Sequence, residues 1–329
     1  MKGTSERPAW AEARPSEGAQ VSSPLNKAAD LSAEVPALAR PSSPLALWRD
    51  YFELSKARIV FMVLLTTLAG LLMASSGGID AILLAHTLLG TALVAGGTNA
   101  LNQYVERDLD RRMNRTRMRP LPDGRITPAA ALIFSVTISV IGTLWLALLV
   151  NLLAAFLALF TLVTYLFIYT PLKLKTSLST LAGAVPGAIP PMIGWAAVSG
   201  RLDAGAWILF AILLFWQMPH FLAIGWLYRE DYARAGFEIL SVGDRDGRAS
   251  GRQAMLYTVG LVVVSILPAF FGIAGAGYLT AALLTGVAFL IASALFASAR
   301  TLRAARTLFV TSIIYLPLIM SLLVAGVPR

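Results

Sequence analysis

Nine runs of about 20 predominantly apolar residues constrain the fold of this chain more than any other feature. A helical run of about 20 residues is long enough to cross a hydrocarbon core roughly 30 Å thick. Backbone N–H and C=O groups find no water in lipid, so such runs fold as helices. We therefore predict an all-α polytopic membrane protein. The predicted spans are approximately 57–75, 81–103, 128–149, 152–170, 178–198, 205–227, 254–273, 277–299 and 305–326.

Composition supports this class and excludes others. Hydrophobic residues make up 57% of the chain, and the mean hydropathy is +0.70. Cysteine is absent, which excludes disulfides, thiolate chemistry and iron–sulfur clusters. The net charge of +9 is better explained by basic cytoplasmic loops than by nucleic-acid binding, because the apolar runs leave little folded soluble surface.

The chain divides into a tail and a membrane domain. Residues 1–46 are rich in Pro, Ala, Ser and charge, and we predict a disordered tail. Residues 47–329 form the transmembrane domain, entered through an amphipathic stretch at 40–58 that we expect to lie along the membrane surface. Most Lys and Arg residues outside the tail lie in alternate loops, so the amino terminus and these loops are expected in the cytoplasm and the carboxyl terminus outside, as in a bacterial inner membrane.

The fifth run carries three prolines within the segment GAVPGAIPPMIGW. Pro186, Pro190 and Pro191 each remove a backbone donor, which predicts a kink or break inside this span. Breaks are tolerated in lipid where protein or a cavity satisfies the freed groups. The position is consistent with a central cavity, although a purely structural kink explains it too.

A charged stretch, NQYVERDLDRRMNRTRMRPLPDG at 102–124, follows the second run and holds four acids and six arginines. Asn102, Glu106 and Asp110 are spaced i, i+4, i+8, so they lie within about 80° of one another on a helix. Mg²⁺ usually takes one or two carboxylates together with substrate phosphates. This spacing, with an asparagine that begins the stripe while still inside the apolar run, favours a metal–phosphate site.

Arginines supply the opposite charge at the same place. Arg115 and Arg119 follow the acids directly, and guanidinium groups bind phosphate oxygens bidentately. Carboxylates holding Mg²⁺ between such arginines would attract a diphosphate and stabilise it as a leaving group. The alternative is a solvated loop with local ion pairs, of which two are available: Glu106–Arg111 and Asp108–Arg112.

A second polar cluster, LYREDYARAGFEILSVGDRDG at 227–247, follows the sixth run on the same side. Asp231 is the candidate second-site ligand, and Tyr228 and Arg229 beside it are candidate substrate-binding residues. Two acidic clusters at the inner ends of two spans could bracket a diphosphate through two or more Mg²⁺ ions. Further along this segment stand two aspartates that we expect to be solvated loop residues, Asp244 and Asp246.

His220 lies inside the sixth run, where an ionisable side chain is costly and often functional. One interpretation is contact with a substrate haem, including axial ligation of its iron. The other is a histidine bonded to a neighbouring helix after the break at Pro219. His86 lies near the outer end of its span, away from the charged stretches.

These stretches resemble the intramembrane aromatic prenyltransferase superfamily. Within it, the sequence is similar to the protoheme IX farnesyltransferase (haem O synthase) family over about residues 50–325. The similar segments are NQYVERDLDRRMNRTRMRPLPDGRI, YTPLKLKT, GAIPPMIGW, WQMPHFLAIGW and REDYARAGF.

The resemblance implies nine helices around a central cavity with cap loops on the cytoplasmic side. It implies farnesyl diphosphate and haem b as substrates, haem O as product, and possible contact with haem A synthase or terminal oxidase assembly. Asn102, Glu106 and Asp110 match the family's Mg²⁺–diphosphate motif. The usual second motif has two aspartates four residues apart, but Ala235 stands four residues after Asp231, so only Asp231 is carried over.

The mechanism that follows needs no cysteine or serine nucleophile. Mg²⁺ on Glu106, Asp110 and Asp231 would neutralise the diphosphate, with Arg115, Arg119 and Lys173 contributing further charge. The allylic carbon–oxygen bond would ionise, a haem vinyl group would attack the farnesyl cation, and water would quench the product cation.

Three other functions compete with this one. A prenyltransferase acting on a quinone precursor differs only in the family-specific segments. An ion-coupled transporter could also contain broken helices and acids, but here the acids gather at one membrane face and are accompanied by arginines. A membrane phosphatidyltransferase would also use clustered aspartates, but such enzymes carry a D-G-x-x-A-R pattern, and this chain does not contain it.

Overall fold

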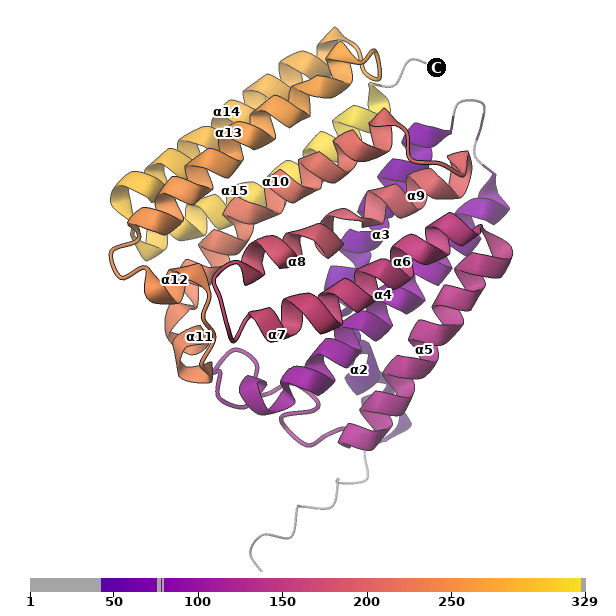
Figure 1. Cartoon of the computed structure of the whole chain (residues 1–329), viewed down its shortest axis with the longest axis vertical. Coiled ribbons are helices and arrows are strands. Elements are labelled where there is room, and N and C mark those ends of the chain that lie inside the picture. The colour runs from indigo at the N-terminus through magenta and orange to yellow at the C-terminus, as the bar shows by residue number, and fades with distance from the viewer. Residues whose placement is uncertain (1–42, 76–77, 79, 327–329) are drawn as a thin grey trace, which may run out of the picture. The chain divides into compact units, whose positions relative to one another are not determined.

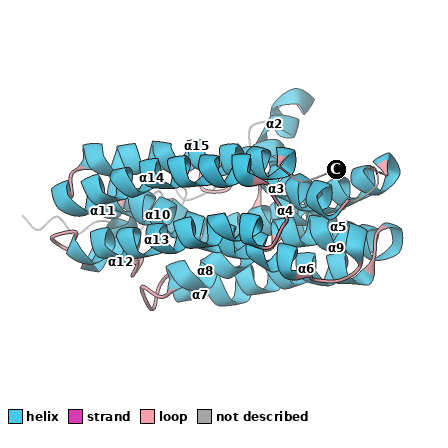
Figure 2. Cartoon of the chain, turned by 90° about the horizontal axis from the view of Figure 1, so that it is seen from above, coloured by secondary structure: helices cyan, strands magenta, loops and turns pink. Residues whose placement is uncertain are grey.

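The structure is a computed structural model that describes residues 43–75, 78 and 80–326. The predicted tail lies outside these residues as far as position 42, and positions 44–46 form the start of the first helix. Every regular element among the described residues is a helix (Figures 1 and 2). The elements are α2 (Pro44–Leu54), α3 (Ala57–Ala74), α4 (Ala81–Asp110), α5 (Pro128–Leu149), α6 (Leu152–Val163), the π-helix η1 (Thr164–Tyr169), α7 (Thr170–Leu172), α8 (Ser179–Ala188), α9 (Pro190–Ser199), α10 (Ala204–Leu227), α11 (Arg229–Ala235), α12 (Leu240–Gly243), α13 (Arg248–Phe270), α14 (Ala276–Ala299) and α15 (Leu302–Ala325).

The prediction of an all-helical polytopic membrane protein is confirmed. Over the described residues, nine helical segments are long and apolar enough to cross a membrane, with α6–α7 and α8–α9 each counting as one. Helix α4 continues beyond the apolar run to Asp110, as the predicted helical stripe of Asn102, Glu106 and Asp110 requires. One predicted boundary is wrong, because α13 begins at Arg248 instead of 254. The turn that precedes its apolar run is polar, and the Ser250 backbone N–H in it donates to Asp244 at 2.7 Å.

The predicted break in the fifth span is present. Helix α8 ends at Ala188 and α9 begins at Pro190, with Ile189 between them. Protein surrounds this span more than any other in the described chain, with 72% of its apolar window buried. The backbone groups that the prolines leave unpaired therefore lie inside the helical bundle and not against lipid.

Helices α3 and α9 pack closely beside this break. A Cβ atom on Gly70 of α3 would strike the backbone of Pro191, and one on Gly194 of α9 would strike the backbone of Thr67. Small residues at such contacts let two backbones approach, which is the usual way that helices associate in membranes.

Short segments cover one end of the helices. Residues 111–127, which we call the cap loop, follow α4, and α11 and α12 follow α10 at the same end (Figure 1). Met113 of the cap loop packs with Ala235 and Phe237, so the two parts of this cap share an apolar cluster. This brings the two polar stretches of the sequence together.

Candidate active site

Helix α4 presents a buried polar stripe at its carboxyl-terminal end. Asn102, Glu106 and Asp110 are only 2%, 5% and 3% exposed. They are polar, but they are buried in the last turns of α4, where the span reaches the cap. Asp108, on the other side of the helix, is exposed and pairs with Arg111. The predicted common face is therefore present, and it points into the protein.

Each oxygen acceptor of the stripe has a cation from a different part of the chain. Lys173 Nζ lies 2.5 Å from Glu106 Oε1, and Arg119 Nη1 lies 2.7 Å from Asp110 Oδ2. Lys56 Nζ donates to Asn102 Oδ1 at 3.2 Å. The predicted local pair Glu106–Arg111 is wrong, because the burial of Glu106 favours a partner from another helix.

Lys173 and Thr170 reach the stripe through a π-helical turn. In η1 the Thr170 hydroxyl donates to the Tyr165 carbonyl five residues earlier, at 2.9 Å. The same hydroxyl oxygen accepts a hydrogen bond from Asn102 Nδ2 at 3.2 Å, which fixes the orientation of that amide. π-Helical turns occur often at functional sites. Here the turn sets the register of α7, at whose end Lys173 stands.

The Lys173 ammonium group stays charged in this environment. Burial alone lowers its pKa, but the Glu106 carboxylate beside it more than compensates, and the net pKa is raised above its ordinary value. The ammonium also lies 4.6 Å from the centre of the Tyr169 ring, a cation–π contact that favours the charged form.

Lys56 is a site residue that the sequence analysis missed. It stands between α2 and α3 with φ 51° and ψ 55°, a left-handed conformation that is costly for a residue other than glycine. Burial and the nearby Arg119 lower its pKa to about 7. A lysine before a first span is explained by the positive-inside rule alone, so the sequence carried no signal of its contact with the stripe.

Asp231, from α11, forms the second acidic position. Its Oδ2 accepts from the Arg115 backbone N–H at 3.1 Å, and its Oδ1 accepts from Arg234 at 2.7 Å. The Arg115 guanidinium donates to the Tyr232 hydroxyl at 3.0 Å and lies 5.0 Å from the centre of the Tyr228 ring. Asp231 is thus tied to the loop that carries Arg115 and Arg119.

The other predicted residues of this segment have different environments. Arg229 stacks on Trp226, with the guanidinium carbon 4.4 Å from the ring centre, so it does not contact the stripe. Asp246 pairs with Arg248 at the surface, as predicted for a solvated residue. Asp244 accepts from the Ser250 backbone N–H at 2.7 Å, a role in the first turn of α13.

The donor set fits Mg²⁺ in kind. Buried carboxylate and amide oxygens are the ligands this ion prefers, and substrate phosphates usually complete its shell. Within the part of the chain that the structure describes, no three His, Cys, Asp or Glu side chains converge on one point. Glu106, Asp110 and Asp231 therefore do not form a single three-carboxylate centre, and ions held here would depend on phosphate oxygens as bridging ligands.

His220 lies between aromatic rings at the α10–α15 contact. Its Nδ1 is 2.7 Å from Ser312 Oγ, and it stacks on Trp216 and Phe309 with ring centres 5.1 Å away in each case. Ser312 Oγ also lies 2.6 Å from the Phe309 carbonyl, so its one proton has two acceptors within reach, and the His220 tautomer depends on which of them it takes. The predicted bond to a neighbouring helix is present.

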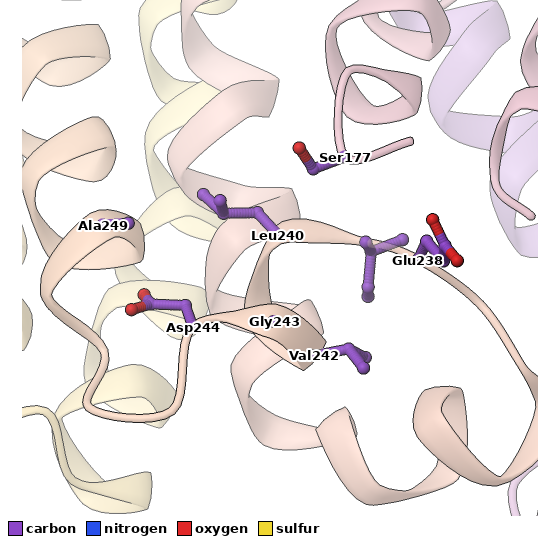
Figure 3. A pocket seen from close by; sticks show the side chains of 8 residues that line it. Ser177, Glu238, Leu240, Val242, Gly243, Asp244 and Ala249 are labelled. Carbon is purple, nitrogen blue, oxygen red and sulfur yellow. The ribbon is translucent and has the colours of Figure 1, made fainter. Parts of the chain in front are cut away.

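A hollow of about 460 Å³ lies elsewhere on the cap (Figure 3). It adjoins the backbone of the site, since the Glu238 N–H donates to the Lys173 carbonyl at 2.8 Å. No basic residue and no residue of the stripe contributes to its wall, so it is a separate feature. Its lining is Ser177, Glu238, Ile239, Leu240, Val242, Gly243, Asp244 and Ala249.

Known proteins resemble this chain in sequence and in fold. Residues 63–316 match the UbiA prenyltransferase family. A Solibacter usitatus protein named protoheme IX farnesyltransferase is 48% identical over 85% of this chain and 99% of its own length. One of the same name from Opitutus terrae is 42% identical over 85% of this chain and 95% of its own length.

Solved structures share the fold. A digeranylgeranylglyceryl phosphate synthase structure aligns with a TM-score of 0.71 at 21% identity, covering 85% of this chain and 98% of that one. A UbiA homologue from Archaeoglobus fulgidus bound to GPP and Mg²⁺ aligns with a TM-score of 0.61 at 13% identity, covering 84% and 99%. The matched family spans most of the membrane domain and includes both polar clusters. This chain is therefore a membrane-embedded enzyme that belongs to the UbiA prenyltransferase family.

Proposed function

We propose that this enzyme transfers a farnesyl group from farnesyl diphosphate to a vinyl group of haem b, giving haem O. The observation that carries the proposal is the buried stripe of Asn102, Glu106 and Asp110, in which every acceptor is matched by a separate cation. Such an arrangement can accept a metal–diphosphate complex, because the carboxylates can hold the ions while the cations turn to phosphate oxygens. That haem b accepts the farnesyl group is inferred from relatives at 48% and 42% identity that carry the protoheme IX farnesyltransferase name.

The residues of the chain would act mainly on the leaving group. Lys173 and Arg119 now neutralise carboxylates at 2.5 and 2.7 Å, and both would exchange these contacts for diphosphate oxygens. Glu106, Asp110 and Asp231 would hold Mg²⁺ only together with phosphate oxygens of the substrate, and the metal would supply further positive charge to the departing diphosphate. Arg115, held between Tyr228 and Tyr232, lies beside Asp231 and adds a further cationic side chain to Lys173 and Arg119.

The reaction then proceeds without an enzyme nucleophile. The allylic C–O bond breaks, and its electron pair leaves with the diphosphate. The vinyl π electrons form the new carbon–carbon bond to the farnesyl cation. Water adds to the resulting cation and loses a proton, which gives the hydroxyethylfarnesyl side chain. Tyr169, already in contact with the Lys173 ammonium, would present an aromatic face to the cation.

His220 would contact the haem. In the tautomer that donates its Nδ1 proton to Ser312, the Nε2 lone pair would be available to a metal, and a histidine ligand is usually oriented in this way by its other nitrogen.

The identity of the molecule that accepts the farnesyl group can be tested with purified enzyme in lipid nanodiscs. Farnesyl diphosphate and Mg²⁺ are supplied with haem b, with a hydroxylated aromatic acid of the kind prenylated in quinone synthesis, or with both. Mass spectrometry should show a farnesylated haem and no prenylated aromatic acid. Prenylation of the aromatic acid alone would contradict the haem assignment and favour a quinone-precursor prenyltransferase.

We also propose that the cap faces the cytoplasm of a bacterial inner membrane. The basic cap segments support this through the positive-inside rule. The chain has no cysteine, so Arg111→Cys and Arg201→Cys can each be labelled without background. A membrane-impermeant maleimide should label position 201 and not position 111 in intact spheroplasts. The reverse pattern would overturn the orientation.

A further inference from the structure

Within the part of the chain that the structure describes, one face of helix α2 is apolar and exposed. Leu45, Trp48 and Phe52 are 79%, 69% and 58% exposed. Their i, i+3, i+7 spacing places them within about 60° of one another on the helix. Figure 2 shows α2 standing out from the other helices, in agreement with the exposure of these side chains.

The opposite face of α2 is fastened to the cap loop. Leu54 is fully buried and packs with Leu121 and Ile126 of that loop. Asp50 is also buried and forms an ion pair with Arg125, the residue before Ile126 in the same loop. The polar and apolar residues on this side of α2 are thus already engaged.

Arg125 connects α2 to several points at once. Besides Asp50, its guanidinium contacts Glu53 of α2 at 3.2 Å and Asp123 at 3.0 Å, and it donates to the Met118 carbonyl at 2.8 Å. Met118 lies next to Arg119, the partner of Asp110. A shift of α2 would therefore reach the loop that carries the phosphate-binding arginines.

The end of α2 also contacts the stripe helix. Gln103, adjacent to Asn102, donates through Nε2 to the Leu54 carbonyl at 2.6 Å. Only Ser55 and Lys56 separate α2 from α3, the first span. This short connection keeps α2 at the depth where α3 leaves the bilayer.

We propose that α2 lies in the headgroup–acyl boundary of the leaflet on the cap side, with Leu45, Trp48 and Phe52 in lipid, and that this docking holds the cap loop in place through Arg125. The occupant is lipid because the short link to α3 fixes the helix at the membrane surface. Its free face also carries aromatic and aliphatic side chains with Arg49 at the margin, the composition of interfacial helices.

The depth of α2 tests the first half of the proposal. Full-length single-cysteine variants Leu45→Cys, Phe52→Cys, Arg111→Cys and Ile141→Cys are spin-labelled in phosphatidylcholine–phosphatidylglycerol nanodiscs. Collision with oxygen and with a water-soluble nickel chelate then reports depth. Labels at 45 and 52 should be about 5–10 Å below the headgroups, shallower than 141, which lies in the middle of α5, and shielded from nickel. Nickel accessibility equal to that of 111 would overturn the proposal.

A label at position 52 also distinguishes lipid from protein. Shielding from both oxygen and nickel, together with spin coupling between two copies, would assign the face to a second copy and overturn the lipid assignment.

The second half is tested through the mobility of the cap loop. A label at Met118→Cys is compared in the parent, in Arg125→Gln and in the triple variant Leu45→Ser, Trp48→Ser, Phe52→Ser. Both changes should increase label mobility several-fold, whereas Arg201→Gln, which removes an ion pair at the opposite end, should not. Unchanged mobility in the triple variant would overturn the coupling. The depth measurement leaves Arg125 intact, so it remains decisive if Arg125→Gln does not fold.

Discussion

Lys173 Nζ lies 2.5 Å from Glu106 Oε1, although the two residues are 67 positions apart in the chain. Both are buried, at 9% and 5% exposed, and each is the charged partner that the other needs inside a membrane protein. The pair joins the end of the fourth span to the polar stripe of the second. It also places the Lys173 ammonium group where the diphosphate is proposed to bind.

Removing one partner of this pair should cost both stability and activity. Lys173→Met leaves the Glu106 carboxylate buried and unpaired, which should lower the free energy of unfolding by about 3–5 kcal/mol. The kcat/KM for farnesyl diphosphate should fall on the order of 10²-fold through loss of charge stabilisation. Denaturation in mixed micelles and steady-state kinetics measure the two effects.

The double variant Glu106→Gln, Lys173→Met serves as the control. It should recover most of the lost stability but none of the activity. A single Lys173→Met variant as stable as the parent would show that the ion pair is not buried in the working enzyme.

The pH dependence of stability and of kcat/KM should show the titration of Lys56. Burial and Arg119 lower its pKa from 10.5 to about 7, so at higher pH the folded enzyme holds fewer protons than the unfolded chain. Its contribution therefore makes the folded state more stable as pH rises from about 7 toward 10.5. In the folded enzyme its charge is lost as pH rises through about 7, so kcat/KM for farnesyl diphosphate should fall above about pH 7.

Substitutions at position 56 separate this effect from other titrations. Lys56→Arg keeps the charge and should flatten the decline, whereas Lys56→Gln should give low, pH-independent values. An unchanged profile in Lys56→Gln would exclude Lys56 as its origin.

Metal dependence should involve the second acidic position. Chelation of divalent ions should abolish prenyl transfer, and Mg²⁺ should restore it. Asp231→Asn removes a ligand charge and should raise the half-saturating Mg²⁺ concentration by about 10-fold or more. Asp246→Asn, an exposed acid of the same segment, should leave it unchanged. Equal Mg²⁺ requirements in the two variants would remove Asp231 from the metal site.

The α3–α9 contact should tolerate no additional atoms. Gly70→Ala places a methyl group against the Pro191 backbone and should destabilise the protein by about 1–3 kcal/mol. Gly277→Ala in α14 meets open space and should be neutral or slightly stabilising. Thermal unfolding in one detergent compares the two. Equal melting temperatures for Gly70→Ala and the parent would mean that the helices separate at little cost.

The helical fold could be predicted from the sequence because its main determinants are local. Run length gave the spans, and Pro190 gave the break between α8 and α9. The start of α13 could not be placed in this way, because its first residues are polar and lie outside the apolar run. The partner that shields Asp110, Arg119, is likewise set by how the cap loop folds, which is a tertiary effect.

The site was predictable only in part for the same reason. The spacing of Asn102, Glu106 and Asp110 is a helical property, and the structure places them on one buried face. Of their cations, Arg119 is only 9 positions from Asp110, but Lys56 and Lys173 are 46 and 67 positions from their partners. Lys173 was a candidate only through family resemblance, and Lys56 was missed because a single basic residue beside a span carries no distinguishing pattern.

The most direct test of the account compares two acids of α4 that face opposite ways. Haem is extracted from cells expressing the parent chain, Glu106→Gln or Asp108→Asn, and each extract is analysed by chromatography and mass spectrometry. We predict a farnesylated haem from the parent and from Asp108→Asn, and only haem b from Glu106→Gln at equal membrane levels of protein. Farnesylated haem from Glu106→Gln at the parent level, or none from the parent with farnesyl diphosphate and Mg²⁺ present, would contradict the account.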